Sequence, residues 1–63
     1  MDDDNAELIS LLCTRIGTIM EDASVIALTL GSQESDIRQV KFEEMKRASA
    51  AIAALVAAVE ALI

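Results

Sequence analysis

The sequence predicts an all-α protein, an antiparallel two-helix hairpin that we expect to dimerise into a four-helix bundle. Three observations predict this fold. The chain has 63 residues without a proline, and 54% of them are hydrophobic, a composition that favours helices. Apolar residues recur three and four residues apart in two long stretches, which is the spacing of one helix face. A single segment rich in turn-forming residues, 31–36, separates the two stretches.

The first helix is predicted over about residues 4 to 30. Asp4 followed three residues later by Glu7 resembles a capping box, and Asp2 and Asp3 add negative charge where the helix dipole favours it. The main apolar positions alternate in spacing like the a and d positions of a heptad: Ile9, Leu12, Ile16, Ile19, Ala23, Ile26 and Leu30. Further apolar residues flank this seam: Leu8, Cys13, Met20 and Ala27. The stripe is therefore wide, as is typical of a bundle helix.

The turn is predicted over residues 31–34 and the second helix over about 34 to 63. We expect Gly31 to end the first helix in a left-handed conformation, and Ser32 or Ser35 to cap the second. The second helix repeats the alternating pattern: Met45, Ala48, Ile52, Leu55, Val59 and Leu62. A short connection makes the two helices antiparallel neighbours, so that residues 1–63 form a single helical-hairpin domain.

The C-terminal run, residues 48–63, raises the alternative of a membrane anchor. Its sixteen residues span about 24 Å as a helix, which is less than the roughly 30 Å of a hydrocarbon core. Glu60 opposes insertion, whereas Lys46 and Arg47 resemble the flank of a tail anchor. We expect a bundle helix here rather than membrane contact. The alternative is a membrane-associated peptide with a tail anchor over residues 45–63.

A single hairpin of this length has little capacity to bury its apolar stripes, because each helix faces only one neighbour. We therefore predict that the chain associates with itself, most simply as a homodimer. The predicted oligomer interface comprises the larger seam residues: Ile9, Leu12, Ile16, Ile19, Ile26, Leu30, Met45, Ile52, Leu55, Val59 and Leu62. Alternatively, the hairpin is a subunit or chaperone-like protein whose stripes are covered by a different protein.

Three larger apolar residues of the first helix, Leu11, Val25 and Leu28, lie off the seam. Isolated apolar side chains are common on protein surfaces. Together, however, these three can form a second contact face. We name them as candidate partner-binding residues for another protein.

The composition argues against several classes of function. There is no histidine and only one cysteine, so no disulfide framework and no Cys/His zinc site is available. We expect no enzymatic activity, no cofactor and no metal, because the carboxylates fall in clusters that are typically solvated. A net charge of −6 opposes nucleic-acid binding. The basic residues at 38–47 alternate with Glu43 and Glu44, so that we expect them to pair among themselves.

The N-terminal residues "MDDDNAEL" lack the basic segment of a secretory signal, and a lone thiol suits a reducing compartment, so we expect a cytoplasmic protein. Cys13 itself is expected to be a small buried apolar residue. The mid-helix glycine, Gly17, is consistent with a close approach of another backbone. Together these features predict a non-enzymatic, self-associating helical interaction module, with a regulatory, adaptor or structural role, that binds another protein.

Overall fold

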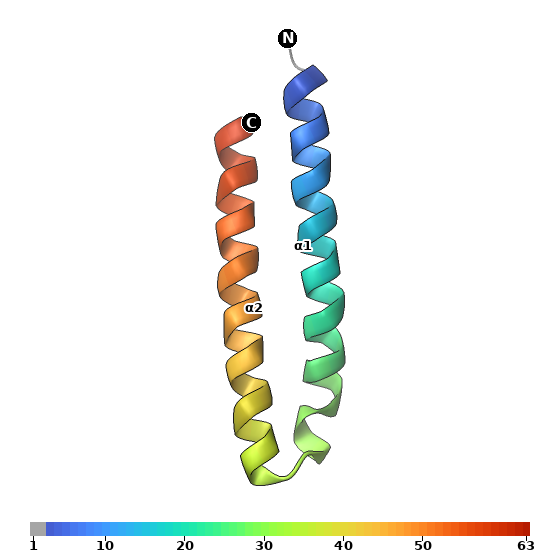
Figure 1. Ribbon diagram of the computed structural model, residues 1–63, viewed down its shortest axis with the longest axis vertical. Coiled ribbons are helices and arrows are strands. Elements are labelled where there is room, and N and C mark those ends of the chain that lie inside the picture. The colour runs from blue at the N-terminus through green and yellow to red at the C-terminus, as the bar shows by residue number, and fades with distance from the viewer. Residues whose placement is uncertain (1–2) are drawn as a thin grey trace.

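The computed structural model describes residues 3–63, with side chains from residue 5 onward. Helix α1 spans Asp3–Thr29, a short 3-10 helix η1 spans Leu30–Ser32, and helix α2 spans Ser35–Leu62. The two long helices lie side by side and antiparallel, with η1 and the turn at the end opposite to the two termini (Figure 1). The predicted all-α antiparallel hairpin is confirmed.

The hairpin is a long single layer that measures 52 × 15 × 10 Å. Its radius of gyration is 14.9 Å, whereas a compact domain of this length has a radius of about 11 Å. Within residues 5–63 no side chain is fully buried. The pair of helices therefore has a shared seam but no enclosed core.

The seam that the heptad pattern predicted is the inner surface of this hairpin. The half-buried apolar residues of α1 and η1 are the predicted seam positions Ile9, Leu12, Ile16, Ile19, Ala23, Ile26 and Leu30. Those of α2 are likewise Met45, Ala48, Ile52, Leu55, Val59 and Leu62. Both helices thus present the same face of their heptads to each other.

Matching these positions in order outward from the turn gives the register of the hairpin. An a position of one helix then lies opposite a d position of the other throughout: Ile9 with Leu62, Leu12 with Val59, Ile16 with Leu55, Ile19 with Ile52, Ala23 with Ala48, and Ile26 with Met45. The next layer toward the turn places Leu30 opposite Lys41, which is half-buried. The apolar seam therefore ends one layer before the turn.

The end of α1 differs from the prediction. Gly31 does not have a positive φ, so the expected left-handed glycine cap was wrong. Instead the chain tightens into η1, where the Gln33 backbone N–H donates to the Leu30 carbonyl at 3.2 Å. The hydroxyls of Thr29 and Ser32 donate to the carbonyls of Val25 and Thr29, at 3.1 and 2.9 Å. Because the Ser32 hydroxyl and the 3-10 turn use the carbonyls of Thr29 and Leu30 at the end of the helix, a left-handed residue is not required.

The start of α2 also lacks the predicted serine cap. Glu34 is the N-cap residue, with an extended backbone and no capping hydrogen bond from its side chain. Arg38 instead closes the turn, since its guanidinium donates to the carbonyls of Gln33 at 3.0 Å and Gly31 at 3.5 Å. Arg38 occupies a heptad position that is apolar elsewhere in the helix, and here it satisfies turn carbonyls instead. The predicted capping box at Asp4 involves a side chain outside the described residues.

Candidate interaction surfaces

The described surface contains no feature of a small-molecule site. No cavity is present along residues 5–63, and no three Asp, Glu or Cys side chains of this part of the chain are grouped as metal ligands. The hydroxyls of Thr14 and Thr18 donate to the backbone carbonyls of Ser10 and Thr14, at 2.9 and 3.1 Å. The exposed faces of the hairpin are the candidate surfaces that its geometry offers.

The chain exposes more surface than a compact protein of its size. Its solvent-accessible area is 4792 Å² for a mass of 6.7 kDa. The area expected of a folded monomer of this mass is about 3,900 Å². The excess of roughly 900 Å² is close to the roughly 800 Å² that each partner buries in a protein–protein interface of standard size.

The predicted oligomer-interface residues face each other across the hairpin, where they are half-buried. They hold the two helices of one chain together, and each keeps part of its surface open to solvent. A second chain therefore has access to this seam only from the two long edges of the hairpin, where the residues next to the seam lie.

These two edges differ in chemistry. In an antiparallel pair of helices, the residues that follow the d positions of both helices lie on one side of the seam. The residues that precede the a positions of both helices lie on the other side. The residues that follow each d position form one edge, which we call the uncharged edge: Cys13, Met20, Ala27, Phe42, Ser49, Val56 and Ile63. The residues that precede each a position form the other, which we call the charged edge: Leu8, Arg15, Asp22, Thr29, Ile37, Glu44, Ala51 and Ala58.

The uncharged edge holds larger apolar side chains that are open to solvent. Met20 is 52% exposed, Val56 49% and Phe42 46%. Cys13 is exposed as well, so the expectation that its side chain is buried was wrong for the single chain.

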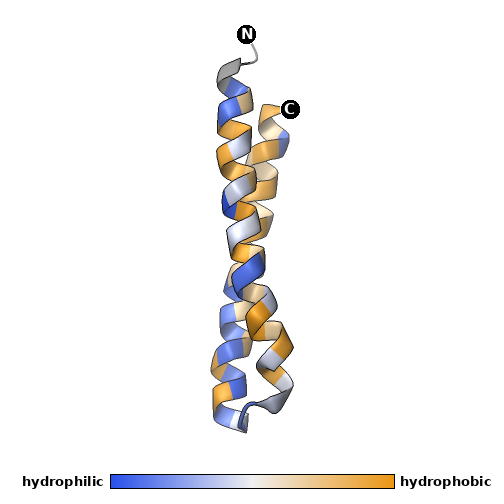
Figure 2. Ribbon diagram, turned by 90° about the vertical axis from the view of Figure 1, so that its right-hand side faces the viewer, coloured by the Kyte–Doolittle hydropathy of each residue, from blue (hydrophilic) through white to orange (hydrophobic). Residues whose placement is uncertain are grey.

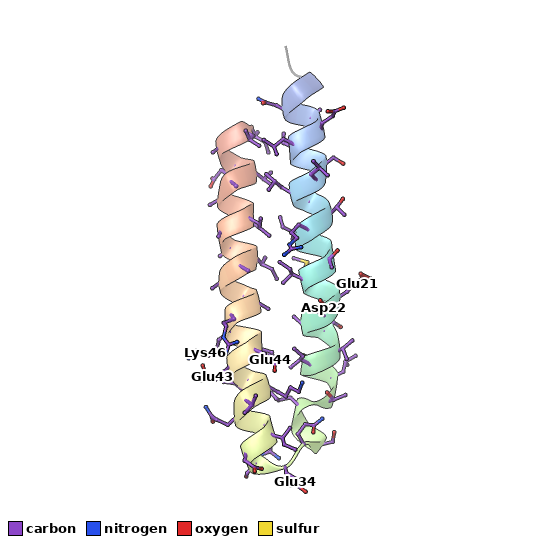
Figure 3. The ribbon with its side chains drawn as sticks, in the orientation of Figure 1. Glu21, Asp22, Glu34, Glu43, Glu44 and Lys46 are labelled. Atoms are coloured by element: carbon purple, nitrogen blue, oxygen red, sulfur yellow. The ribbon has the colours of Figure 1, made fainter. Side chains whose placement is uncertain are left out.

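Two lysines of the basic segment form ion pairs with Glu43 and Glu44, as the sequence predicted. Lys41 Nζ lies 3.7 Å from Glu44 Oε1, and Lys46 Nζ lies 3.8 Å from Glu43 Oε2. Figure 3 shows Glu43 and Lys46 on the outer side of α2, and Glu44 on the side toward α1. Lys46 is exposed and the other three side chains are half-buried, but all four remain open to solvent, so each pair contributes little to stability.

The three candidate partner-binding residues are not gathered in one patch. Leu28 is 83% exposed, and it lies one turn from Val25, which is 63% exposed. Leu11 is also exposed, but it is two heptads from Val25 on the same helix face, about 21 Å along the axis. Thr18 occupies the position midway between them. Only Val25 and Leu28 are adjacent.

The C-terminal half of α2 is the most uniformly apolar segment of the hairpin, whereas the half next to the turn is largely hydrophilic (Figure 2). Even so, neither helix in the described part of the chain has a stretch that is both long and apolar enough to cross a membrane.

Comparison with known proteins gave no match: no protein-family model, no curated protein and no solved structure resembles this chain significantly.

The difference between the two edges is the feature that the sequence interpretation missed. The flanking residues Leu8, Cys13, Met20 and Ala27 were grouped as a single widening of the stripe, although Leu8 lies on the opposite side of the seam from the other three. The sequence does distinguish the two sides of the seam, because a flanking residue either precedes an a position or follows a d position. In an antiparallel pair, residues of the same kind from both helices share one edge, so this distinction assigns each flanking residue to an edge.

Proposed function

We propose that this chain is a non-enzymatic, self-associating helical interaction module whose stable form is a homodimer, a four-helix bundle made of two hairpins. The observation that carries the proposal is that residues 5–63 contain no buried side chain. Burial of apolar surface is the main favourable contribution to folding, so a hairpin without an enclosed core has little to offset the entropy of ordering its chain. A shared core between two copies supplies that burial.

The function of such a module lies in the surface that it presents after assembly. The proposed role is to bind another protein, in a regulatory, adaptor or structural capacity. Candidate contacts are Val25 and Leu28, which are adjacent and exposed, together with Leu11 farther along α1. The net charge of −6 favours a partner with a basic or amphipathic surface.

The substitution Ile52→Asp tests the shared core. Ile52 is a half-buried seam residue in the middle of α2, and a charge there disfavours every packed form of the seam. We expect the variant to lose both dimer mass in sedimentation and most of its helical circular dichroism. The control is Ala50→Asp, which adds the same charge to the same helix at an exposed outer position and should keep both.

An Ile52→Asp variant that remains a folded, helical monomer would contradict the shared core. The unmodified chain distinguishes the alternatives. If it requires detergent to stay in solution, it is a membrane-associated peptide with an anchor at residues 45–63. If it is poorly structured or aggregated when expressed alone, its stripes are covered by a different protein rather than by a second copy.

A further inference from the structure

We propose which surface of the hairpin the second copy contacts, and in which orientation, a proposal that rests on the self-association described above. The second hairpin packs on the uncharged edge, antiparallel to the first, so that the two turns lie at opposite ends of the bundle. A two-fold axis perpendicular to the long axis then passes close to the middle of the hairpin. In this arrangement α1 lies beside the partner's α1, and α2 lies beside the partner's α2.

The choice of edge follows from the cost of burying charge. A second copy on the charged edge would bring Arg15, Asp22 and Glu44 of both chains into the interface. Two-fold symmetry would allow Arg15 to face the partner's Asp22, but Glu44 and its ion-pair partner Lys41 would lose water as well. Removing charged groups from water is unfavourable even when they are paired, because the desolvation penalty can exceed the attraction between them.

The uncharged edge carries no charged group, and it has the exposed Met20, Phe42 and Val56 along its length. The exposed apolar residues of the charged edge, Leu8 and Ile37, lie near its two ends, with the charged residues between them.

The available area fits a second copy. The surface in excess of a compact fold, roughly 900 Å², matches what one partner of a standard dimer covers. A hairpin on the other side of the same edge has the same length, 52 Å, and the same apolar side chains, so that the two faces are covered along their whole length. A C2 interface joins identical patches, and a patch without charge meets its own copy without repulsion.

The position of Gly17 supports the antiparallel orientation. A Cβ atom added at Gly17 would meet nothing within 4 Å, so that the packing of α1 on α2 does not explain this glycine. The expectation of a close backbone approach is therefore not met within the hairpin. Gly17 lies one turn from both Cys13 and Met20, on the side of α1 next to the uncharged edge. In the antiparallel arrangement it faces the partner's Met20, a long and adaptable side chain that fits over a residue without Cβ.

A charge pair at the rim supports the same axis. Lys46 and Glu60 lie on α2 just outside the uncharged edge, seven residues on either side of Ala53. An axis at Ala53 places Lys46 of each chain opposite Glu60 of the other.

The same axis can be located in α1. Ala53 lies next to Ile52, which pairs with Ile19, so this axis is at the height of Thr18 in α1. The midpoint between Gly17 and Met20 is at the same height. Two separate pairs therefore give one two-fold axis.

The edge is tested by placing one glutamate on each side of α2. Val56→Glu is on the uncharged edge and Ala58→Glu is on the charged edge, and both positions are exposed in the hairpin. We expect Val56→Glu to raise the dimer dissociation constant, measured by sedimentation equilibrium, at least tenfold. Ala58→Glu should change it less than threefold. The reverse order would assign the second copy to the charged edge and overturn the proposal.

The orientation is tested by a disulfide. In the antiparallel dimer Ser24 of one chain lies opposite the partner's Cys13, whereas within one chain these residues are about 16 Å apart along α1. We expect Ser24→Cys to give a covalent dimer under mild oxidation, seen on non-reducing gels, and the unmodified chain to give little. A crosslinked unmodified chain with no gain from Ser24→Cys would overturn the antiparallel arrangement.

These outcomes separate the two proposals. If the unmodified chain is a dimer and neither glutamate weakens it, the edge assignment fails while self-association stands. If the unmodified chain is a folded monomer, self-association itself fails, and with it the interface. A stable assembly with a different protein on the uncharged edge, and a monomer in its absence, would likewise overturn the second copy as occupant.

Discussion

The two long edges of the hairpin flank the same seam, yet one carries Met20, Phe42 and Val56 and the other Arg15, Asp22 and Glu44. Both edges are open to solvent, so the fold of the single chain does not require them to differ. The seam determines that the two helices of the chain pair with each other. In the proposed dimer, the flanks determine on which side the second copy packs, so the residues that specify assembly differ from those that define the hairpin.

The largest effect is expected from Gly17→Leu, because this substitution should stabilise the single hairpin and destabilise the dimer. In an isolated hairpin the new side chain meets open space, and replacing glycine within a helix stabilises it by about 1 kcal/mol. In the dimer it meets the partner's Met20, and overpacking costs about 1–3 kcal/mol. We expect sedimentation to show weaker association, with loss of helix in the chains that separate. Stronger or unchanged association would show that Gly17 is not at the interface.

A smaller effect is expected from exchanging the rim charges. Lys46→Glu and Glu60→Lys each place like charges opposite one another, and exposed pairs of this kind are worth about 0.2–1 kcal/mol. Each single change should weaken the dimer by that amount at low salt and less at high salt. The double change should restore the association. If the double variant is as weak as the two single effects added together, the two positions do not face each other.

The smallest effect is expected at the outer face, away from both edges. Leu28→Ser removes the most exposed large hydrophobic side chain in the described part of α1, which is 83% open to solvent. Surface changes of this kind usually alter the free energy of unfolding by less than about 0.5 kcal/mol. Thermal melting and solution mass should therefore be unchanged, while affinity for a protein partner that uses Val25 and Leu28 should fall. A loss of dimer mass would place Leu28 in the assembly interface instead.

Much of the fold could be predicted from the sequence because the heptad spacing is local and repeats without interruption. The residues that it selected, such as Ile16 and Leu55, are those that face each other in the hairpin. The caps were harder to predict. Gly31, Ser32 and Ser35 are all suitable capping residues, but the chain used a 3-10 turn at the end of α1, and the Arg38 guanidinium donates to the turn carbonyls of Gln33 and Gly31. Several solutions of similar energy compete at a turn, and composition does not rank them.

The interaction surface could be predicted only in part, and Cys13 shows why. Its residue type favours burial, yet it is exposed in the single hairpin, because burial depends on what lies beside the helix and not on the helix alone. Leu11 illustrates the converse. Like Val25 and Leu28 it is a larger apolar residue off the seam, but it lies two heptads from Val25 along the helix, so the three residues do not form one patch.

The shared core of two hairpins is tested by sedimentation equilibrium of the unmodified chain over a dilution series, with circular dichroism on the same samples. We expect a species of twice the 6.7 kDa chain mass at micromolar concentration, and loss of helix as dilution separates the two copies. A fully helical species of single-chain mass throughout the series would contradict it.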